Sequence, residues 1–473
     1  MPRSPSRLGP VAAMSLVAGS MMGIGIFIAP PVVATQLDRP GAFLLVWLLG
    51  GISALCGALS VAELGAMMPR AGGDYPYLRR AYGPGLAFAA GWLQLLAVFP
   101  GSLAAMAVGT ASFQLPLVLG EGFVAPSVLG LDPILFWASV LVIGLTAVNH
   151  VGVLVSGRLQ VAVTIAPVLL LLVGTAAVMV HQGTHAGALA TAGANMHVPS
   201  IAALAAAFLP VYFAFSGWNA AIFVGGEIDE PARNVPRALV GGTVSVTVLY
   251  LALCLGFLSV FTMASLANTG EAGTAAATVI FGPWGRWGVT IAILLAMLGS
   301  LNGTVLTGSR IAFAMAKDGH CIAIAGQASR RHGTPAVALW MQCGWTLLLI
   351  FTHSFEALIG YASAAMLITG SLTVVAVFVL RAKLPHLPRP YRTWGYPVTP
   401  AIYVVLSLGV LVVLARRFDP SVFAGAGWFA LALVFHHVVM RRRGGPAQPA
   451  DTSPTAATAE PGEIIASHPP LVR

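Results

Sequence analysis

The stretch Gly19-Ser20-Met21-Met22-Gly23-Ile24-Gly25-Ile26-Phe27 places three glycines in the middle of a hydrophobic run from about Pro10 to Leu37. A helix that crosses a bilayer must satisfy its own backbone hydrogen bonds. A break at mid-membrane therefore survives only where protein or a water-filled cavity accepts the freed groups. We predict that this stretch interrupts a membrane-spanning helix and contributes to a binding site.

A second hydrophobic run, from Ile201 to Gly226, contains the stretch Phe213-Ala214-Phe215-Ser216-Gly217-Trp218-Asn219. Two interrupted segments in corresponding halves of a membrane chain indicate a transporter whose substrate site lies where the breaks meet. Neither break contains Asp, Glu, Lys, Arg or His. The predicted site therefore needs no side-chain charge at a depth where one is costly.

The composition is that of an integral membrane protein, with 58% hydrophobic and 8% charged residues, where soluble domains average about 25% charged. The first apolar run is longer than a signal-peptide core of roughly 7–15 residues and no small-residue cleavage site follows it, so we expect it to remain in the mature chain. The net charge is +9, but Lys and Arg lie in short loops beside apolar runs. We therefore do not expect nucleic-acid binding.

Apolar runs of about 20 residues are long enough to span a bilayer, and we count twelve. They cover residues 10–37, 41–68, 85–114, 132–150, 157–180, 200–226, 237–262, 287–316, 334–351, 355–381, 398–415 and 421–440. With the N-terminus inside, Lys and Arg divide twenty to four in favour of the inner loops, since only Arg39, Arg286, Arg416 and Arg417 fall outside. This bias predicts a multi-pass protein of the cell (inner) membrane with both termini in the cytoplasm.

The spans predict an all-α membrane protein built as two inverted repeats of five spans each, followed by two more spans. An odd number of spans per repeat forces the two repeats into opposite orientations, and the broken segment comes first in both. We divide the chain into a cytoplasmic N-terminal tail (1–9), a first repeat (10–190), a second repeat (191–383), the last two spans (384–443) and a disordered cytoplasmic tail (444–473).

The two breaks suit a zwitterion such as a free amino acid. Each break leaves unpaired N–H groups at the start of its second half and unpaired carbonyls at the end of its first half, and the helix dipoles add charge of the matching sign. We expect the N–H groups of Gly23, Ile24 and Gly25 to hold the carboxylate. We expect the carbonyls of Met21, Phe213, Ala214 and Ser216 to hold the ammonium. Alternatively, the glycines serve close helix packing, although the spacing of Gly23 and Gly25 is poor for it.

Four blocks of sequence resemble the amino acid/polyamine/organocation superfamily of permeases, and within it the L-type amino acid transporters. The resemblance covers about residues 10–440. The blocks are Gly19 to Phe27 with Pro30; Phe213 to Asn219 with Glu227 and Pro231-Ala232-Arg233-Asn234-Val235-Pro236; Gly299-Ser300-Leu301-Asn302-Gly303 with Ser309-Arg310 and Asp318-Gly319-His320; and Pro390-Tyr391-Arg392-Thr393-Trp394-Gly395-Tyr396-Pro397.

The resemblance implies the leucine-transporter fold, with alternating access around the two broken helices and an amino acid as substrate. It implies that Phe213 closes over the substrate, that Asn219 is a polar pocket residue and that Asn302 belongs to the substrate site. Simpler alternatives are a core- or lipid-facing Phe213 and an interhelical hydrogen bond for Asn219.

Four departures from the family pattern bear on substrate and mechanism. Ile24 stands where L-type members usually carry serine, Pro167 where many sodium-independent relatives carry a lysine, and Thr304 where arginine/agmatine exchangers carry a tryptophan. The last change removes a cation–π partner and disfavours arginine. The loop from Phe113 to Asp132 contains no cysteine, so we expect no disulfide-linked ancillary subunit.

Charged residues near the membrane suggest gates. Glu227, with Asp229 and Glu230, lies opposite Arg233 and Arg237, a pattern that suits an inner-gate salt bridge or a solvated loop. Glu63, inside the second run, suits pairing with a donor such as Arg70, or proton coupling. The histidines and the four cysteines lack metal-ligand spacing, so we expect no metal and no cofactor.

The leading interpretation is therefore a secondary transporter of neutral L-amino acids, working by sodium-independent exchange or proton symport in contact with membrane lipid. A cationic amino acid or polyamine permease would be favoured by an acidic group in the pocket, and the sequence places none near either break. An intramembrane enzyme would need paired Asp, HExxH or Ser/His/Lys groups at mid-span, which the runs lack. A non-transporting amino acid receptor of the same fold remains an alternative.

Overall fold

The computed structural model describes residues 7–120, 130–182, 199–329, 331–352 and 355–440. Over these residues the chain is helical, and its only extended pairings are two isolated β-bridges. The all-α prediction is confirmed. The predicted disordered tail (444–473) and most of the N-terminal tail (1–9) lie outside the described residues.

Ten helical segments in the described part of the chain are long and apolar enough to cross a membrane. They are α1 (Pro10–Met21) with α2 (Gly25–Gln36), α3 (Pro40–Met67), the run α5 (Pro84–Leu93), η1 (Gln94–Val98), α6 (Phe99–Gly109), η2 (Thr110–Gln114) and α7 (Leu115–Leu119), α9 (Pro133–Val151), α10 (Val153–Gln182), α13 (Pro231–Val260), α15 (Ala272–Lys317), α17 (Phe355–Lys383), α18 (Val398–Arg416), and α19 (Pro420–Phe435) with η6 (His436–Met440). Two shorter apolar helices, α11 (Ile201–Ala214) and α16 (Ala336–Thr352), lie at the sixth and ninth predicted spans.

Short elements connect these helices: α4 (Asp74–Tyr82), α12 (Ala220–Phe223), η4 (Gly225–Glu227), α14 (Met263–Ala267) and η5 (Ala323–Gly326). Helix α15 bends at Gly282, whose φ of +62° only glycine adopts readily, just before Pro283. It then continues to Lys317, one residue beyond the predicted end of the eighth span.

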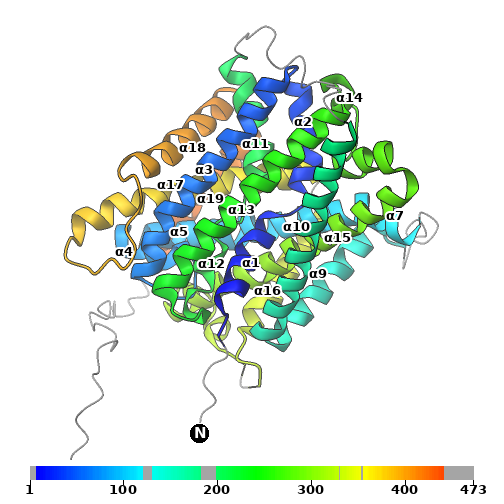
Figure 1. Cartoon of the computed structure of the whole chain (residues 1–473). Helices are drawn as coiled ribbons and strands as arrows, with labels where there is room; N and C mark the ends of the chain where they lie inside the picture. Colours follow the sequence, from blue (N-terminus) through cyan, green and yellow to red (C-terminus); the bar gives the residue numbers. More distant parts are fainter. Residues whose placement is uncertain (1–6, 121–129, 183–198, 330, 353–354, 441–473) are drawn as a thin grey trace, which may run out of the picture.

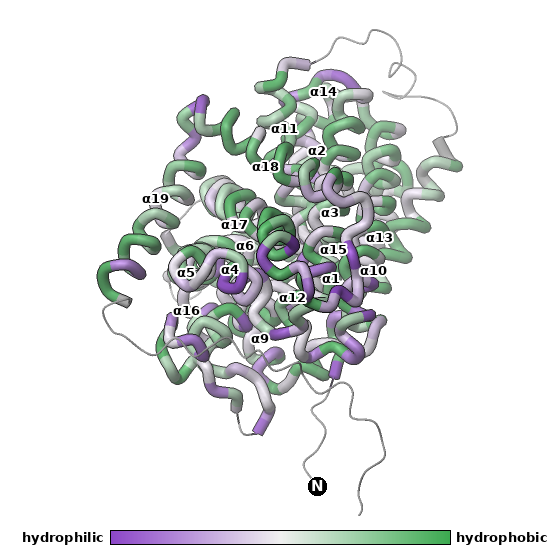
Figure 2. Tube along the Cα trace, turned by 90° about the vertical axis from the view of Figure 1, so that its left-hand side faces the viewer, coloured by the Kyte–Doolittle hydropathy of each residue, from purple (hydrophilic) through white to green (hydrophobic). Residues whose placement is uncertain are grey.

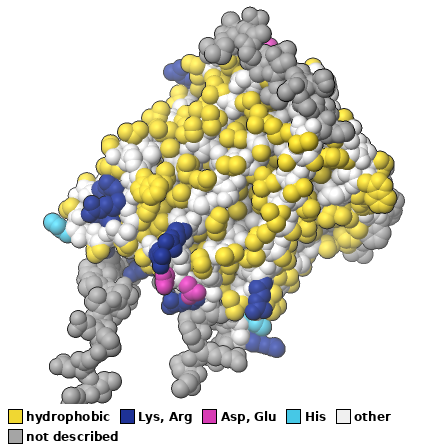
Figure 3. Space-filling view, in the orientation of Figure 1, with side chains coloured by type: hydrophobic (Ala, Val, Ile, Leu, Met, Phe, Trp, Pro, Cys, Tyr) yellow, Lys and Arg dark blue, Asp and Glu magenta, His cyan; other side chains and the backbone are white. Residues whose placement is uncertain are grey.

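The broken helices lie inside the bundle. Helix α1 packs against α10, α13 and α15, and α2 packs against α11, while α13 runs alongside α3 (Figure 1). Hydrophobic side chains cover the middle of the face in Figure 3, and most of the Lys and Arg visible there lie toward its lower end. Hydrophilic residues also gather around α4 and α12 (Figure 2). The apolar outer faces suit lipid, and the breaks are shielded from it.

Both predicted breaks are confirmed. Helix α1 ends at Met21 and α2 begins at Gly25, and between them the N–H of Gly23 donates to the Met21 carbonyl over 2.8 Å. Helix α11 ends at Ala214, and α12 begins only at Ala220. Gly217 has a φ of +95° in the turn between them. Both breaks therefore contain glycines, and Gly217 has a left-handed conformation that other residues adopt only with strain.

Candidate functional site

The two breaks touch each other at glycines. A β-carbon added at Gly25 would lie 2.8 Å from the Cβ of Ala214. One added at Gly217 would lie 2.7 Å from the backbone of Ser20. Real Cβ atoms do not approach backbone this closely, so only glycine permits the contact. The first broken helix thus meets the second at two points, as the sequence pattern requires.

The start of α2 carries free hydrogen-bond donors. Within the described residues, the N–H groups of Ile24, Gly25 and Ile26 have no acceptor, whereas the N–H of Gly23 is donated to Met21. Unpaired N–H groups at a helix N-terminus form an anion site together with the positive end of the helix dipole. The predicted carboxylate donors Ile24 and Gly25 are therefore free, and Gly23 is engaged in a local turn.

Tyr250 on α13 joins the carbonyl ends of both breaks. Its fully buried hydroxyl lies 2.6 Å from the Met21 carbonyl oxygen and 3.1 Å from that of Ala214. Two of the carbonyls expected to hold an ammonium group thus face one phenol, and a third, that of Phe213, accepts from the N–H of Ser216. Tyr250 was not among the residues predicted from the sequence. Its position inside an apolar run could have pointed to it, because a buried tyrosine hydroxyl usually needs a hydrogen-bond partner.

A cavity of about 70 Å³ lies beside the second break. Ser20 of α1, Phe213 of α11 and residues 216–219 of the turn line it, together with side chains of α6, α15, α17 and α18. Of the predicted substrate residues, Phe213, Ser216 and Asn219 therefore line the cavity. Gly25 and Ala214 lie at the contact between the breaks instead, Gly23 faces Ser300 and Met106, and Met21 and Ile24 do not line the cavity either. In the described residues the Asn219 side chain makes no hydrogen bond, so its amide is free to face the cavity.

Asn302 does not line the cavity. Its side chain is fully buried, accepts from Asn149 Nδ2 over 2.9 Å and donates to Gln160 Oε1 over 2.8 Å. These bonds tie α15 to α9 and α10 behind α1. Asn302 thus supports the packing around the first break, and its predicted contact with substrate has no counterpart in this arrangement.

The cavity also reaches a carboxyl group that sequence reasoning did not place there. Asp74, the first residue of α4, lines the cavity with Gln94 of η1. The expectation of no acidic group in the pocket is wrong, because α4 folds back against α17 and brings Asp74 to the site. Burial raises the pKa of Asp74 to about 7.

Residues 8–435 match the family described as "Amino acid permease". The chain belongs to this family. It is similar to the serine/threonine exchanger SteT of Bacillus subtilis (strain 168), with 30% identity over 85% of this chain and 90% of the relative. It is also similar to mouse (Mus musculus) Asc-type amino acid transporter 1, with 30% identity over 86% and 76%. Human (Homo sapiens) large neutral amino acids transporter small subunit 2 is 28% identical over 89% and 80%. These relatives are transporters and not enzymes, and the resemblance to L-type permeases is confirmed.

Glu227 of the permease pairs with a different arginine from those expected. Its carboxylate accepts from Nε and Nη2 of Arg310 on α15, over 3.0 and 3.1 Å, and only 2% of the Arg310 surface is exposed. Pairing of Glu227 with Arg233 or Arg237 is therefore wrong. Arg233 instead lies 3.7 Å from Glu230 at the exposed surface. The buried pair closes the segment after α12 onto α15.

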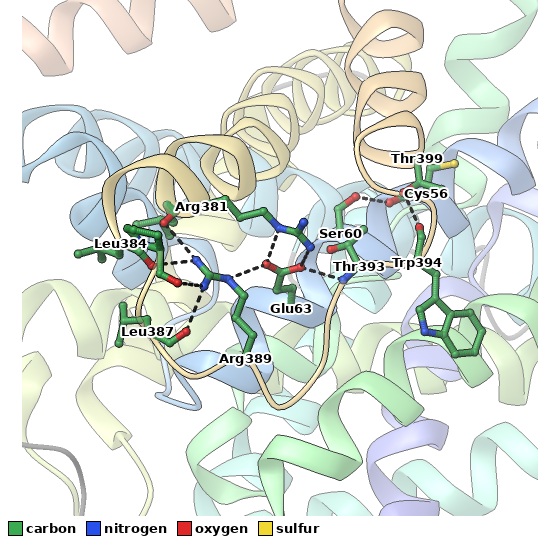
Figure 4. A network of polar contacts seen from close by, with 12 residues as sticks. Cys56, Ser60, Glu63, Arg381, Leu384, Leu387, Arg389, Thr393, Trp394 and Thr399 are labelled. Atoms are coloured by element: carbon green, nitrogen blue, oxygen red, sulfur yellow. Dashed lines mark hydrogen bonds and ion pairs between the residues drawn. The ribbon is translucent and has the colours of Figure 1, made fainter.

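Glu63 of the permease is held by two arginines, and neither is Arg70. It accepts from Nη2 of Arg381 over 2.6 Å and from Nε of Arg389 over 3.2 Å (Figure 4). The N–H of Thr393 donates to it over 2.8 Å. The bonds fasten α3 to the end of α17 and to the loop that follows. The expected pairing with Arg70 is corrected, because Arg381 and Arg389 lie far along the sequence and close in the fold.

Proposed function

We propose that this permease is a secondary active transporter of neutral L-amino acids that works by alternating access, as a sodium-independent exchanger or a proton symporter. The observation that carries the proposal is the contact of the two breaks, with free N–H groups at the start of α2 and a cavity lined by Ser20 of the first break and residues 216–219 of the second. The names of the relatives support neutral amino acids, since they include a serine/threonine exchanger and a large neutral amino acids transporter.

In this proposal the N–H groups of Ile24 and Gly25 bind the substrate carboxylate. The carbonyls near the end of α11, with that of Met21, bind the ammonium after the Tyr250 hydroxyl has moved away from the carbonyls of Met21 and Ala214. Phe213 closes over the bound amino acid, and Asn219 contacts its side chain. Glu227 gates the inner side together with Arg310, its buried partner.

The proposal includes twelve spans, two inverted repeats of five and cytoplasmic termini in the cell (inner) membrane. The ten long helices and the two shorter apolar helices α11 and α16 support the count. We also propose that no disulfide-linked ancillary subunit is needed, because residues 113–132 contain no cysteine.

A cationic amino acid permease is a second candidate, and Asp74 in the cavity wall favours it. An acidic side chain there suits a basic substrate group. A non-transporting receptor of the same fold is a third candidate from another class, and it would bind amino acids without moving them.

Counterflow in proteoliposomes separates these candidates. Vesicles loaded with one unlabelled amino acid are tested with a panel of labelled amino acids, with and without a proton or sodium gradient. We expect uptake of neutral L-amino acids that needs no sodium. Uptake of basic amino acids alone would favour the second candidate, and binding without uptake the third.

Gly25→Trp tests the position of the site. The indole would collide with Ala214, so we expect substrate binding to be lost while the purified variant still elutes as a single folded species. A matched control is Gly427→Trp on α19, because a β-carbon there meets nothing. Normal transport by Gly25→Trp would contradict the site.

A further inference from the structure

Asp74 is a buried carboxyl group that the proposed amino acid site does not use. Only 2% of its surface is exposed, and it lines the cavity together with Gln94, which is buried to the same degree. Among the residues that line this cavity, Asp74 is the one carboxyl group. It stands on α4, outside the segments long enough to span the membrane.

The hydrogen bonds of Asp74 are incomplete. Its Oδ2 accepts from Gln94 Nε2 over 2.7 Å, whereas its Oδ1 and the Oε1 of Gln94 have no partner among the described residues. The Thr373 hydroxyl lies near the carboxyl group and, like Gln94, favours its charged form, but in the structure it donates to the Thr369 carbonyl over 2.9 Å. An unpartnered buried carboxylate oxygen is costly. The cost falls when Oδ1 carries a proton.

Within the part of the chain that the structure describes, no cation is paired with Asp74. Helix α4 packs against α5, α15 and α17, and α5 carries no charged residue. Five basic groups of α4, α15 and α17 are engaged elsewhere: Arg79 with Asp318, Arg310 with Glu227, Lys317 over the Phe313 ring, Arg381 with Glu63, and Lys383 with the Ala81 carbonyl. The two others described on these helices, Arg80 of α4 and Arg286 of α15, do not line the cavity. The titratable groups that interact with Asp74 are the phenols of Tyr77, Tyr212 and Tyr403.

Burial without a cation favours the neutral acid, and it brings the pKa of Asp74 to about 7. At this value a small change in hydration decides whether the group holds a proton. A transport cycle changes hydration by opening the cavity to water on one side and then the other. Groups with this property are the ones that proteins use for proton transfer near neutral pH.

We propose that Asp74 is the proton-binding site of this permease, and that its proton crosses the membrane together with the amino acid. The inference rests on the proposed function, which leaves exchange and proton symport open. When the cavity is open to water on the outer side, hydronium gives its proton to the carboxylate, an O–H bond forms at Oδ1, and the proton stays there while the cavity is closed. It returns from the same oxygen to water when the cavity hydrates, so the step needs no other reactant.

The wild-type protein gives the first test. Proteoliposomes that contain a trapped pH-sensitive dye receive a neutral L-amino acid that supports counterflow. We expect the lumen to acidify during uptake. An inward gradient of one pH unit should raise accumulation by up to about tenfold for one proton per substrate. Counterflow by preloaded vesicles, together with no acidification of vesicles that hold no internal substrate, would overturn the inference and leave the proposed function standing. Absence of counterflow with every neutral amino acid would overturn both.

Asp74→Asn gives the second test, because the amide mimics the protonated acid. We expect this variant to keep counterflow but to lose proton-driven accumulation and the change of uptake rate around pH 7. The matched control is Asp38→Asn, since the Asp38 side chain is 95% exposed, and it should keep all three properties. Proton-driven accumulation by Asp74→Asn would overturn the inference.

A further outcome identifies the alternative ligand. If wild-type protein takes up lysine or arginine, and Asp74→Asn loses this uptake but keeps neutral counterflow, Asp74 binds a basic side chain and the proton proposal is wrong. If Asp74→Asn elutes as an aggregate, the dye measurement on the wild type still overturns the inference when no proton enters with the amino acid.

Discussion

Glu63 on α3 and Asp74 on α4 are two carboxylates with nearly the same burial, 1% and 2% exposed, and with opposite surroundings. Glu63 meets two arginines and a backbone N–H. Asp74 meets one amide group and leaves an oxygen without a partner. The comparison indicates that a buried carboxylate with all its hydrogen bonds formed stabilises the packing of helices. A buried carboxylate with an unpaired oxygen at a cavity is available to bind a proton or a ligand.

The largest expected effect is on stability at Glu63. Glu63→Gln leaves Arg381 and Arg389 without their buried anion, and removal of one partner from a buried ion pair costs about 3–5 kcal/mol. We expect a clear drop in the melting temperature of the purified protein in detergent. The control is Glu230→Gln, which breaks an exposed pair at 3.7 Å worth about 0–1 kcal/mol. Equal melting temperatures for the two variants would contradict the claim that Glu63 holds α3 to α17 and the loop that follows.

At Asp74 the expected effect is on how stability changes with pH. Its raised pKa means that the folded protein binds this proton more tightly than the unfolded chain. The stability gained is complete below about pH 4 and is lost as the pH rises toward 7, at about 1.4 kcal/mol per pH unit. Melting curves of the wild type and Asp74→Asn should therefore differ in slope over this window. Parallel curves would show that Asp74 does not titrate there.

Local sequence was enough to predict the two breaks. Gly23, Gly25 and Gly217 interrupt apolar runs. The requirement is local at Gly217, which has a positive φ, whereas Gly25 is needed for the close contact with Ala214 of the other break. The long apolar helices were also predictable from local sequence, since about 20 hydrophobic residues suffice to span a bilayer.

The partners of charged groups were not predictable in this way. Sequence reasoning paired Glu227 and Glu63 with arginines a few residues away, while the fold pairs them with arginines 83 and 318 residues away. Asp74 was missed because it belongs to a connecting helix, and Tyr250 because its two acceptors come from two different breaks. Each depends on which helices pack together, which apolar periodicity alone does not specify.

The central claim is that backbone groups at the two breaks bind both charged ends of an amino acid. The most direct measurement is competition in wild-type counterflow between a labelled neutral L-amino acid and three unlabelled compounds: the same amino acid, its methyl ester and its N-acetyl derivative. The claim predicts strong competition by the free amino acid and little by either derivative, because each lacks one charge. Equal competition by the ester or the N-acetyl compound would contradict it.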